Sequence, residues 1–377
     1  MEDLESRSPF GSPIPARHPD SAPPTITEEE PSAAPSAAVP PTTPQLSPAV
    51  PAEQVSGWSQ FGQPPFAGQP AGYPATGWTP PPPAEKPAEW GRKRQLVKLL
   101  SFGLAKVKPG QEEVAYRDNV RAVRQGSWPR CARIVVANPK GGVGKTPLAV
   151  ALGGKLAQIR GGGVVVWDAA EAAGSTGSRS ESRPGRCISE VEANPDLYSQ
   201  PGTISAAVAT QSSFADILGS LTDREFTESS VQRVLWTLDR SYRISVADTG
   251  NVPHSPAFTE VMRRADLVVV PTAITKDSVD KACALLQRMQ DSPTGLLQRA
   301  VVAVMHNRGP ETPGLGGKID SIFHSHGVGA VVHIPFEPVL AAGTSITVSD
   351  FTHESDIAWT RLAAAVATNL ITAPERN

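Results

Sequence analysis

Short apolar runs recur along the second two thirds of the chain, separated by longer mixed segments. Each run holds four to seven residues rich in valine, isoleucine and alanine, which is typical of strands buried on both faces. Polar residues or proline follow most of the runs directly. The pattern predicts six buried strands, at residues 133–137, 164–167, 242–247, 266–271, 300–305 and 328–334.

The segments between these runs carry apolar residues at helical spacing. Strands that alternate with helices predict an α/β fold, with a doubly wound, mostly parallel sheet and helices on both faces. Ligands of such sheets bind at the carboxyl ends of the strands. We expect helices at residues 148–159, 204–221, 229–240, 276–290 and 357–371, and a loop of small residues at 174–182.

The first 90 residues lack this periodicity and contain 22 of the 38 prolines. Such a composition does not bury enough apolar surface to offset chain entropy, so we predict a disordered Pro/Ala-rich extension at 1–91. This extension is acidic, with ten acidic and three basic side chains, whereas residues 92–130 carry ten basic and three acidic ones. We interpret 92–130 as a basic helical linker and 131–377 as one α/β domain.

Two N-terminal features could recruit partners. The proline run 80–83 could bind a protein partner as a polyproline II ligand, although a flexible spacer is the favoured interpretation of this region. Residues 92–107 place leucines and a valine on one helical face among five basic residues. Such a helix could bind an anionic membrane surface or DNA, or it could dock on its own domain. Both interpretations stay open.

Cysteine usage and hydropathy indicate a cytoplasmic protein. The three cysteines, Cys131, Cys187 and Cys283, have no metal-ligand spacing, so we expect reduced thiols and no metal cluster. No apolar run reaches transmembrane length, and the first residues do not resemble a signal peptide.

Residues 140–146 read KGGVGKT, between a predicted strand and a predicted helix, and have the features of a phosphate-binding loop. Glycines let backbone N–H groups turn onto phosphate oxygens, a lysine reaches the β- and γ-phosphates, and a hydroxyl holds Mg²⁺. Lys145 and Thr146 provide the last two groups. We predict that the nucleotide is bound by Lys140, Gly141, Gly142, Val143, Gly144, Lys145, Thr146 and Pro147.

Asp248 ends a predicted strand about 100 residues after this loop. A carboxylate at that edge can hold the Mg²⁺ shell, so Thr146 and Asp248 are the predicted metal ligands. A capping aspartate would be the simpler explanation if the loop were absent. Asp168, Asn307 and Pro335 also follow predicted strands and should lie at the same edge of the sheet.

The loop departs from the usual G-x-x-x-x-G-K-[ST] pattern, because Pro139 replaces the first glycine and Lys140 adds a second lysine. This departure resembles the deviant Walker A loop of ParA/MinD-like ATPases. The resemblance covers about residues 92–372 and is strongest to actinobacterial members with a Pro-rich N-terminal extension, including EspI-type ATPases associated with type VII secretion. It rests on Asn138-Pro139-Lys140, Trp167-Asp168, Glu171, the run from Asp248 to Asn251, and Ile334-Pro335.

The resemblance implies ATP and Mg²⁺ as ligands and an ATP-dependent homodimer, in which Lys140 reaches the partner's nucleotide. It implies that Asp168 is the switch I aspartate and that Asn307, Pro335 and Glu337 belong to the adenine pocket. The family usually has D-x-D at switch I, but Ala170 stands at the second position here, and Glu171 follows it. The predicted catalytic residues are therefore Lys140, Asp168 and Glu171, and hydrolysis should be slow.

The leading functional interpretation is a dimeric ATP-dependent switch acting in partition, in subcellular positioning or in the regulation of type VII secretion. Its partner would bind the Pro-rich extension or the core, and the protein would be cytoplasmic, at the membrane surface or at the nucleoid. The alternative is a nucleotide-binding scaffold with little or no hydrolysis. An amidotransferase-type ligase on the same fold also stays open, although no residue supports it.

Overall fold

The computed structural model describes residues 90, 108–171, 174–183, 185–220, 222–290 and 295–371. The chain divides into the units Met1–Pro81 and Pro82–Asn377, and all described residues belong to the second. The predicted disordered extension, apart from Trp90, and the predicted basic helix at 92–107 lie outside the described residues.

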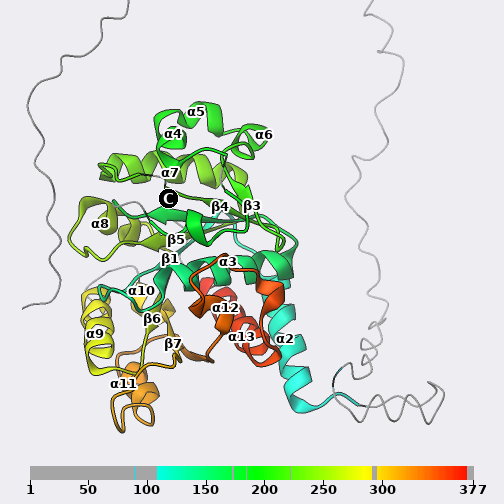
Figure 1. Cartoon of the computed structure of the whole chain (residues 1–377), viewed down its shortest axis with the longest axis vertical. Coiled ribbons are helices and arrows are strands. Elements are labelled where there is room, and N and C mark those ends of the chain that lie inside the picture. Colours follow the sequence, from blue (N-terminus) through cyan, green and yellow to red (C-terminus); the bar gives the residue numbers. More distant parts are fainter. Residues whose placement is uncertain are drawn as a thin grey trace, which may run out of the picture. The chain divides into compact units, whose positions relative to one another are not determined.

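Within the described residues, one eight-stranded sheet has the order β3-β4-β2-β5-β1-β6-β7-β8 (Figure 1). All neighbouring strands are parallel except β3 and β4. The predicted doubly wound α/β fold is therefore confirmed, with all six predicted strands present. The strands are β1 (Ala132–Val136), β2 (Val164–Ala169), β3 (Ala209–Thr210), β4 (Ala215–Leu218), β5 (Ile244–Thr249), β6 (Leu267–Thr272), β7 (Val301–Met305) and β8 (Ala330–Ile334).

Helices cover both faces of the sheet, which explains why its central strands are apolar on both sides. One face packs against α2 (Gln111–Gln125), α3 (Lys145–Arg160) and α13 (His353–Ile371). The other packs against α4 (Ile188–Ala193), α5 (Pro195–Tyr198), α6 (Pro201–Ile204), α7 (Glu228–Ser241), α8 (Pro256–Arg263), α9 (Lys276–Gln290), α10 (Leu296–Arg299) and α11 (Ile319–Ser325). The short α12 (Pro338–Ala341) follows β8.

The helix predicted at 204–221 is wrong. That segment forms the antiparallel strands β3 and β4, and Phe214 in their connection has a φ of 67°. From residue 209 to residue 217, burial alternates with the period of two that a strand requires. Two of the buried residues, Gln211 and Ser213, are polar, so apolar and polar residues do not alternate along the sequence as burial does. Gln211 is satisfied because its Nε2 donates to the Ala209 carbonyl at 2.7 Å.

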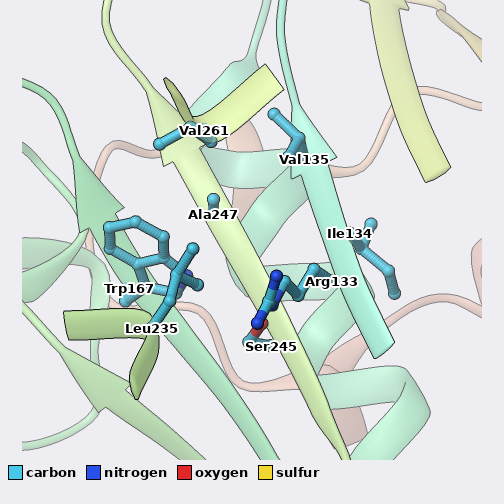
Figure 2. Close-up of a pocket in the computed structure, with 8 residues that line it drawn as sticks. All are labelled: Arg133, Ile134, Val135, Trp167, Leu235, Ser245, Ala247 and Val261. Carbon is cyan, nitrogen blue, oxygen red and sulfur yellow. The ribbon is translucent and has the colours of Figure 1, made fainter. Parts of the chain in front are cut away.

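A small cavity lies between the sheet and the helices α7 and α8 (Figure 2). Its volume of about 10 Å³ is close to the space that one water molecule needs. Trp167 and Ser245 are among the residues that line the cavity. The indole Nε1 of Trp167 and the hydroxyl of Ser245 are both buried without a hydrogen-bond partner among the described residues. This cavity fits a buried water and is far too small for a nucleotide.

Trp90 packs against the domain although it lies in the predicted extension. Its ring centroid is 4.9 Å from that of Tyr116 on α2 and 4.6 Å from that of His353 on α13. Its backbone N–H donates to Oε2 of Glu113 at 3.3 Å. Trp90 therefore joins the first turns of two helices that pack against each other.

We expect the chain that lacks residues 1–89 to melt within about 1 °C of the full chain, because Trp90 is retained. Adding Trp90→Ala should cost about 1–2 kcal/mol, since aromatic pairs contribute about 0.5–1.5 kcal/mol each. That loss should lower the melting temperature by roughly 2–8 °C in calorimetry. Equal melting temperatures with and without Trp90→Ala would contradict this role for the Trp90 contacts.

Candidate nucleotide-binding site

The loop between β1 and α3 is anchored to the neighbouring strand β6 by Asn138. Its side-chain Nδ2 donates to the Pro271 carbonyl at 2.7 Å, and its Oδ1 accepts the Lys140 N–H at 2.9 Å. Asn138 is fully buried, so both bonds are shielded from water. One side chain thereby fixes the start of the loop to the centre of the sheet.

Two glycines give the loop its shape. Gly142 and Gly144 have φ values of 74° and 89°, in the left-handed region that favours glycine. Gly144 is the N-cap of α3, which begins at Lys145 and runs for 16 residues. The loop thus ends at the N-terminus of a long helix, where free N–H groups and the helix dipole favour a bound anion.

Lys145 is only 9% exposed, and its ammonium group lies inside the loop. Its Nζ donates to the Lys140 carbonyl at 3.2 Å and to Oδ1 of Asn251. Burial lowers the pKa of Lys145, and the Asp248 carboxylate partly opposes this effect. Among the described residues, the hydrogen bonds of this buried cation go to two neutral oxygens, which phosphate oxygens are well suited to replace.

Hydroxyl groups and a carboxylate meet beside Lys145. The Ser175 hydroxyl donates to Oγ1 of Thr146 at 3.0 Å, and the Thr176 hydroxyl donates to Oδ2 of Asp248 at 2.8 Å. The other oxygen of Asp248, Oδ1, is buried without a hydrogen-bond partner in the described part of the chain. Hard oxygen donors with one unused buried lone pair fit Mg²⁺, so the predicted ligands Thr146 and Asp248 suit the ion chemically.

Burial raises the pKa of Asp248 to about 6, with the Thr146 and Thr176 hydroxyls acting in the opposite direction. A carboxyl pKa raised on folding favours the folded state at low pH, and this benefit is lost as pH rises from about 4 to 6. At pH 7 the ionised carboxylate therefore destabilises the unliganded domain.

We expect Asp248→Asn to stabilise the unliganded chain at pH 7 by roughly 1–3 kcal/mol, since one pKa unit corresponds to about 1.4 kcal/mol. The gain should shrink as pH falls from 6 to 4, because the native carboxyl is then protonated. The same variant should lose the Mg²⁺ dependence of nucleotide binding. Urea unfolding at several pH values measures the first effect, and lower stability of Asp248→Asn at pH 7 would contradict it.

Asp168 lies beside Asp248, because these two residues are paired across β2 and β5. Asp168 is fully buried, its Oδ1 accepts the Ala170 N–H at 3.1 Å, and burial raises its pKa. Gly174 packs directly on this carboxylate, since a β-carbon there would be 2.0 Å from Oδ2 of Asp168. Glu171 follows the strand, with its Oε1 buried and unpartnered in the described structure.

Lys140 points to α9 rather than into the loop. Its Nζ lies 2.6 Å from Oδ2 of Asp277, and both side chains are largely solvated, at 43% and 56% exposure. The Lys140 carbonyl, by contrast, contributes to the loop by accepting from Lys145. The two lysines of the loop therefore occupy different environments, one buried and one exposed.

The predicted adenine residues lie at the carboxyl ends of β7 and β8. Asn307 is exposed and its Oδ1 accepts the Gly309 N–H at 3.2 Å. Pro335 lines an open pocket of about 600 Å³ together with residues of α13. Glu337 is only 3% exposed, and its Oε2 accepts from the N–H and hydroxyl of Thr352 at 3.0 and 3.1 Å. The Glu337 carboxylate thus joins α12 to the start of α13.

Three residues of this site are not among those predicted from the sequence. Ser175 and Thr176 fall in the segment interpreted only as a loop of small residues. Arg224 lies before α7, and its Nη2 donates to the Asp168 carbonyl at 2.7 Å. Hydroxyls in the loop after a switch-like aspartate were an available signal, whereas nothing near Arg224 in the sequence indicates its partner.

Comparisons with known proteins agree with this arrangement. Residues 134–268 match the CobQ/CobB/MinD/ParA nucleotide binding domain. The ESX-1 secretion-associated protein EspI of Mycobacterium tuberculosis is 27% identical over 267 residues, a match that covers 68% of this chain and 39% of that protein. The chain thus matches about two fifths of the length of this relative.

The fold has a counterpart among solved structures. The structure of a ParA family ATPase from Chlorobium tepidum TLS covers 62% of this chain and 98% of its own, with a TM-score of 0.51 and 15% identity. At that identity the likeness concerns the fold.

None of the described helices combines the length and the apolar character needed to cross a membrane.

Proposed function

Because residues 134–268 form a ParA/MinD-like nucleotide-binding domain, we propose that this chain binds Mg-ATP at residues 138–147 and acts as an ATP-dependent dimeric switch. The observation that carries the proposal is one loop with two lysines in different settings. Lys145 is buried among the groups that would surround the phosphates, whereas Lys140 is exposed. A loop that bound only the nucleotide of its own chain would need only one of these two lysines.

The phosphates would be held by backbone N–H groups of the loop and by Lys145. Mg²⁺ would be held by Thr146 and Asp248 and would neutralise charge on the phosphates. The adenine would lie near Asn307 and Pro335, at the carboxyl ends of β7 and β8. The Glu337 carboxylate is occupied by Thr352, so any contact from residue 337 to the base would come from its backbone.

Dimerisation would use Lys140. Its ion pair with Asp277 is solvated, and pairs of this kind contribute about 0–1 kcal/mol. Breaking the pair is therefore cheap compared with the charge-assisted bonds that a lysine forms to phosphate. The ATP-bound dimer would present a surface for a protein partner, on the core or through the Pro-rich extension.

Hydrolysis would be slow. The reaction joins a water oxygen to the γ-phosphorus, breaks its bond to the β–γ bridging oxygen, and releases ADP, phosphate and a proton. Ala170 has no polar side-chain atom to orient that water, which leaves Asp168 and Glu171. A positioned acid–base group contributes typically ~10²–10⁴-fold, so its loss or displacement would favour long-lived ATP complexes. The alternative function is a scaffold that binds ATP and does not hydrolyse it.

The cellular role that we favour is regulation of protein secretion, because a curated relative of part of this chain is named a secretion-associated protein. Partition and subcellular positioning are the other roles open to such a switch. The basic residues of 92–107 would add binding to DNA or an anionic membrane, at the nucleoid or the membrane surface of a cytoplasmic protein.

Light scattering during size-exclusion chromatography tests the switch. The native chain should double its mass with Mg²⁺ and a non-hydrolysable ATP analogue, and it should remain monomeric with Mg-ADP. A nucleotide titration of the same sample establishes that the analogue is bound. An unchanged mass in the presence of bound analogue would contradict the dimeric switch and favour the monomeric scaffold.

A further inference from the structure

Arg224 holds both ends of the short segment that follows β2. Its backbone N–H donates to the Glu171 carbonyl at 2.9 Å, and its Nη2 donates to the Asp168 carbonyl at 2.7 Å. Residues 168–171 contain the candidate switch I aspartate, Ala170 and the candidate carboxylate of Glu171. One arginine, distant in sequence, therefore sets the backbone of this segment.

The guanidinium group has a fixed orientation. Its Cζ lies 4.0 Å from the centre of the Phe226 ring, and Phe226 makes an edge contact with Trp167 at a centroid distance of 6.4 Å. A cation–π contact of this kind restricts the directions in which the remaining N–H groups point. Burial lowers the pKa of Arg224, and the nearby carboxylates of Asp168, Glu192 and Glu171 oppose this effect.

Unused hydrogen-bonding atoms of opposite charge lie in this region. Nε and Nη1 of Arg224 and Oε1 of Glu171 are all buried without a partner among the described residues. Each such atom costs about 1–3 kcal/mol, and more when the group is charged. Oε2 of Glu171 is 3.5 Å from the place that a β-carbon on Gly250 would take, so the carboxylate faces the turn that follows Asp248.

We propose that Arg224 is a positioning residue that donates from its free N–H groups to Oε1 of Glu171 when nucleotide closes the site. The paired Glu171 carboxylate then orients the water for attack and takes the place of a carboxylate at position 170. This proposal rests on the ATP hydrolysis proposed above. A merely structural Arg224 would hold the backbone of 168–171 with no coupling to the Glu171 side chain.

Single-turnover hydrolysis of prebound ATP separates the two roles. In the full chain, Arg224→Gln and Glu171→Gln should each slow hydrolysis by about 10–100-fold, in line with the contribution of a positioned acid–base group. ATP affinity should stay within about threefold, since within the described structure neither side chain forms a hydrogen bond or ion pair with residues 138–147. The double variant should be no slower than the slower single variant, because both changes remove the same function.

Two further variants control for loss of structure. Arg233→Gln removes an arginine of α7 that pairs with Glu192 at 2.6 Å, and it should leave hydrolysis unchanged. Arg224→Lys keeps the cation and most of the apolar stem, so it should recover part of the rate. If Arg224→Gln does not fold, Arg224→Lys takes its place in the double-variant comparison with Glu171→Gln.

Several results would overturn the proposal. The first is a double variant whose rate loss is the product of the losses of the Arg224 and Glu171 single variants. The second is an Arg224 variant that folds and hydrolyses ATP at the native rate. The third is a native chain that binds ATP without turnover. Failure of the proposed function is distinct, because the native chain would then not bind ATP in the same titration.

Discussion

We expect the Lys145→Ala variant to bind Mg-ATP at least about 100-fold more weakly than the native chain, because two charge-assisted bonds of about 1.5–3 kcal/mol each are lost. The Lys145 ammonium is buried between the Lys140 carbonyl and Asn251, whereas the ammonium of Lys140, the other lysine of the loop, pairs with Asp277 on α9. Its removal leaves the phosphate charge to the backbone N–H groups and Mg²⁺.

The melting temperature of the Lys145→Ala variant distinguishes loss of ATP binding from loss of the folded structure. Burial lowers the pKa of Lys145, so the charged group is unfavourable in the unliganded domain, and Lys145→Ala should melt no lower than the native chain. Lys276→Ala is a matched control, since this exposed lysine pairs with Asp280 on α9 and should bind ATP normally. Native affinity in a well-folded Lys145→Ala variant would refute the assignment of the loop.

The Lys140→Ala variant should bind Mg-ATP within about threefold of the native chain but lose ATP-dependent dimerisation. Its side chain lies outside its own loop, paired with Asp277, so the local site is left intact. If the lysine acts on the partner's nucleotide, turnover should fall by about 10³-fold or more, the effect that a cation supplied in trans has on phosphoryl transfer.

Asp277→Ala provides the complementary control for Lys140. It frees the lysine without removing it, and dimerisation should be retained or strengthened. Light scattering with bound ATP analogue, followed by phosphate release, measures both variants. A Lys140→Ala chain that still dimerises and turns over, or one that loses ATP binding instead, would show that Lys140 acts only within its own loop.

Much of the architecture follows from local sequence. The valine-rich runs that became β2 and β6 are buried on both faces, so their apolar pattern is continuous and easily recognised. The ParA/MinD-like resemblance is confirmed by the family match of residues 134–268, and it rested on the loop together with residues at the ends of β2, β5 and β8. The helix predicted over 204–221 failed because two buried residues of this segment, Gln211 and Ser213 in the connection between β3 and β4, are polar. Oε1 of Gln211 accepts the Glu181 N–H at 2.7 Å, a contact that the tertiary structure sets.

The site was predictable only where its chemistry is local. Loop glycines, Lys145, Thr146 and Asp248 stand at recognisable positions after strands, and the structure brings them together. Arg224 reaches Asp168 from 56 residues away in sequence, and the sequence holds no sign of that contact. The Glu337 carboxylate shows a further contact that the sequence does not indicate, because it accepts hydrogen bonds from Thr352. A contact between the backbone of Glu337 and the adenine stays a prediction.

Calorimetric titration of the full chain with ATP, in the presence of Mg²⁺, tests the central claim most directly. We expect one site per chain for the native protein, weaker binding when Mg²⁺ is chelated, and no measurable heat with Lys145→Ala. Absence of binding by the native chain, or equal binding by the native chain and a folded Lys145→Ala variant, would contradict nucleotide binding at this loop.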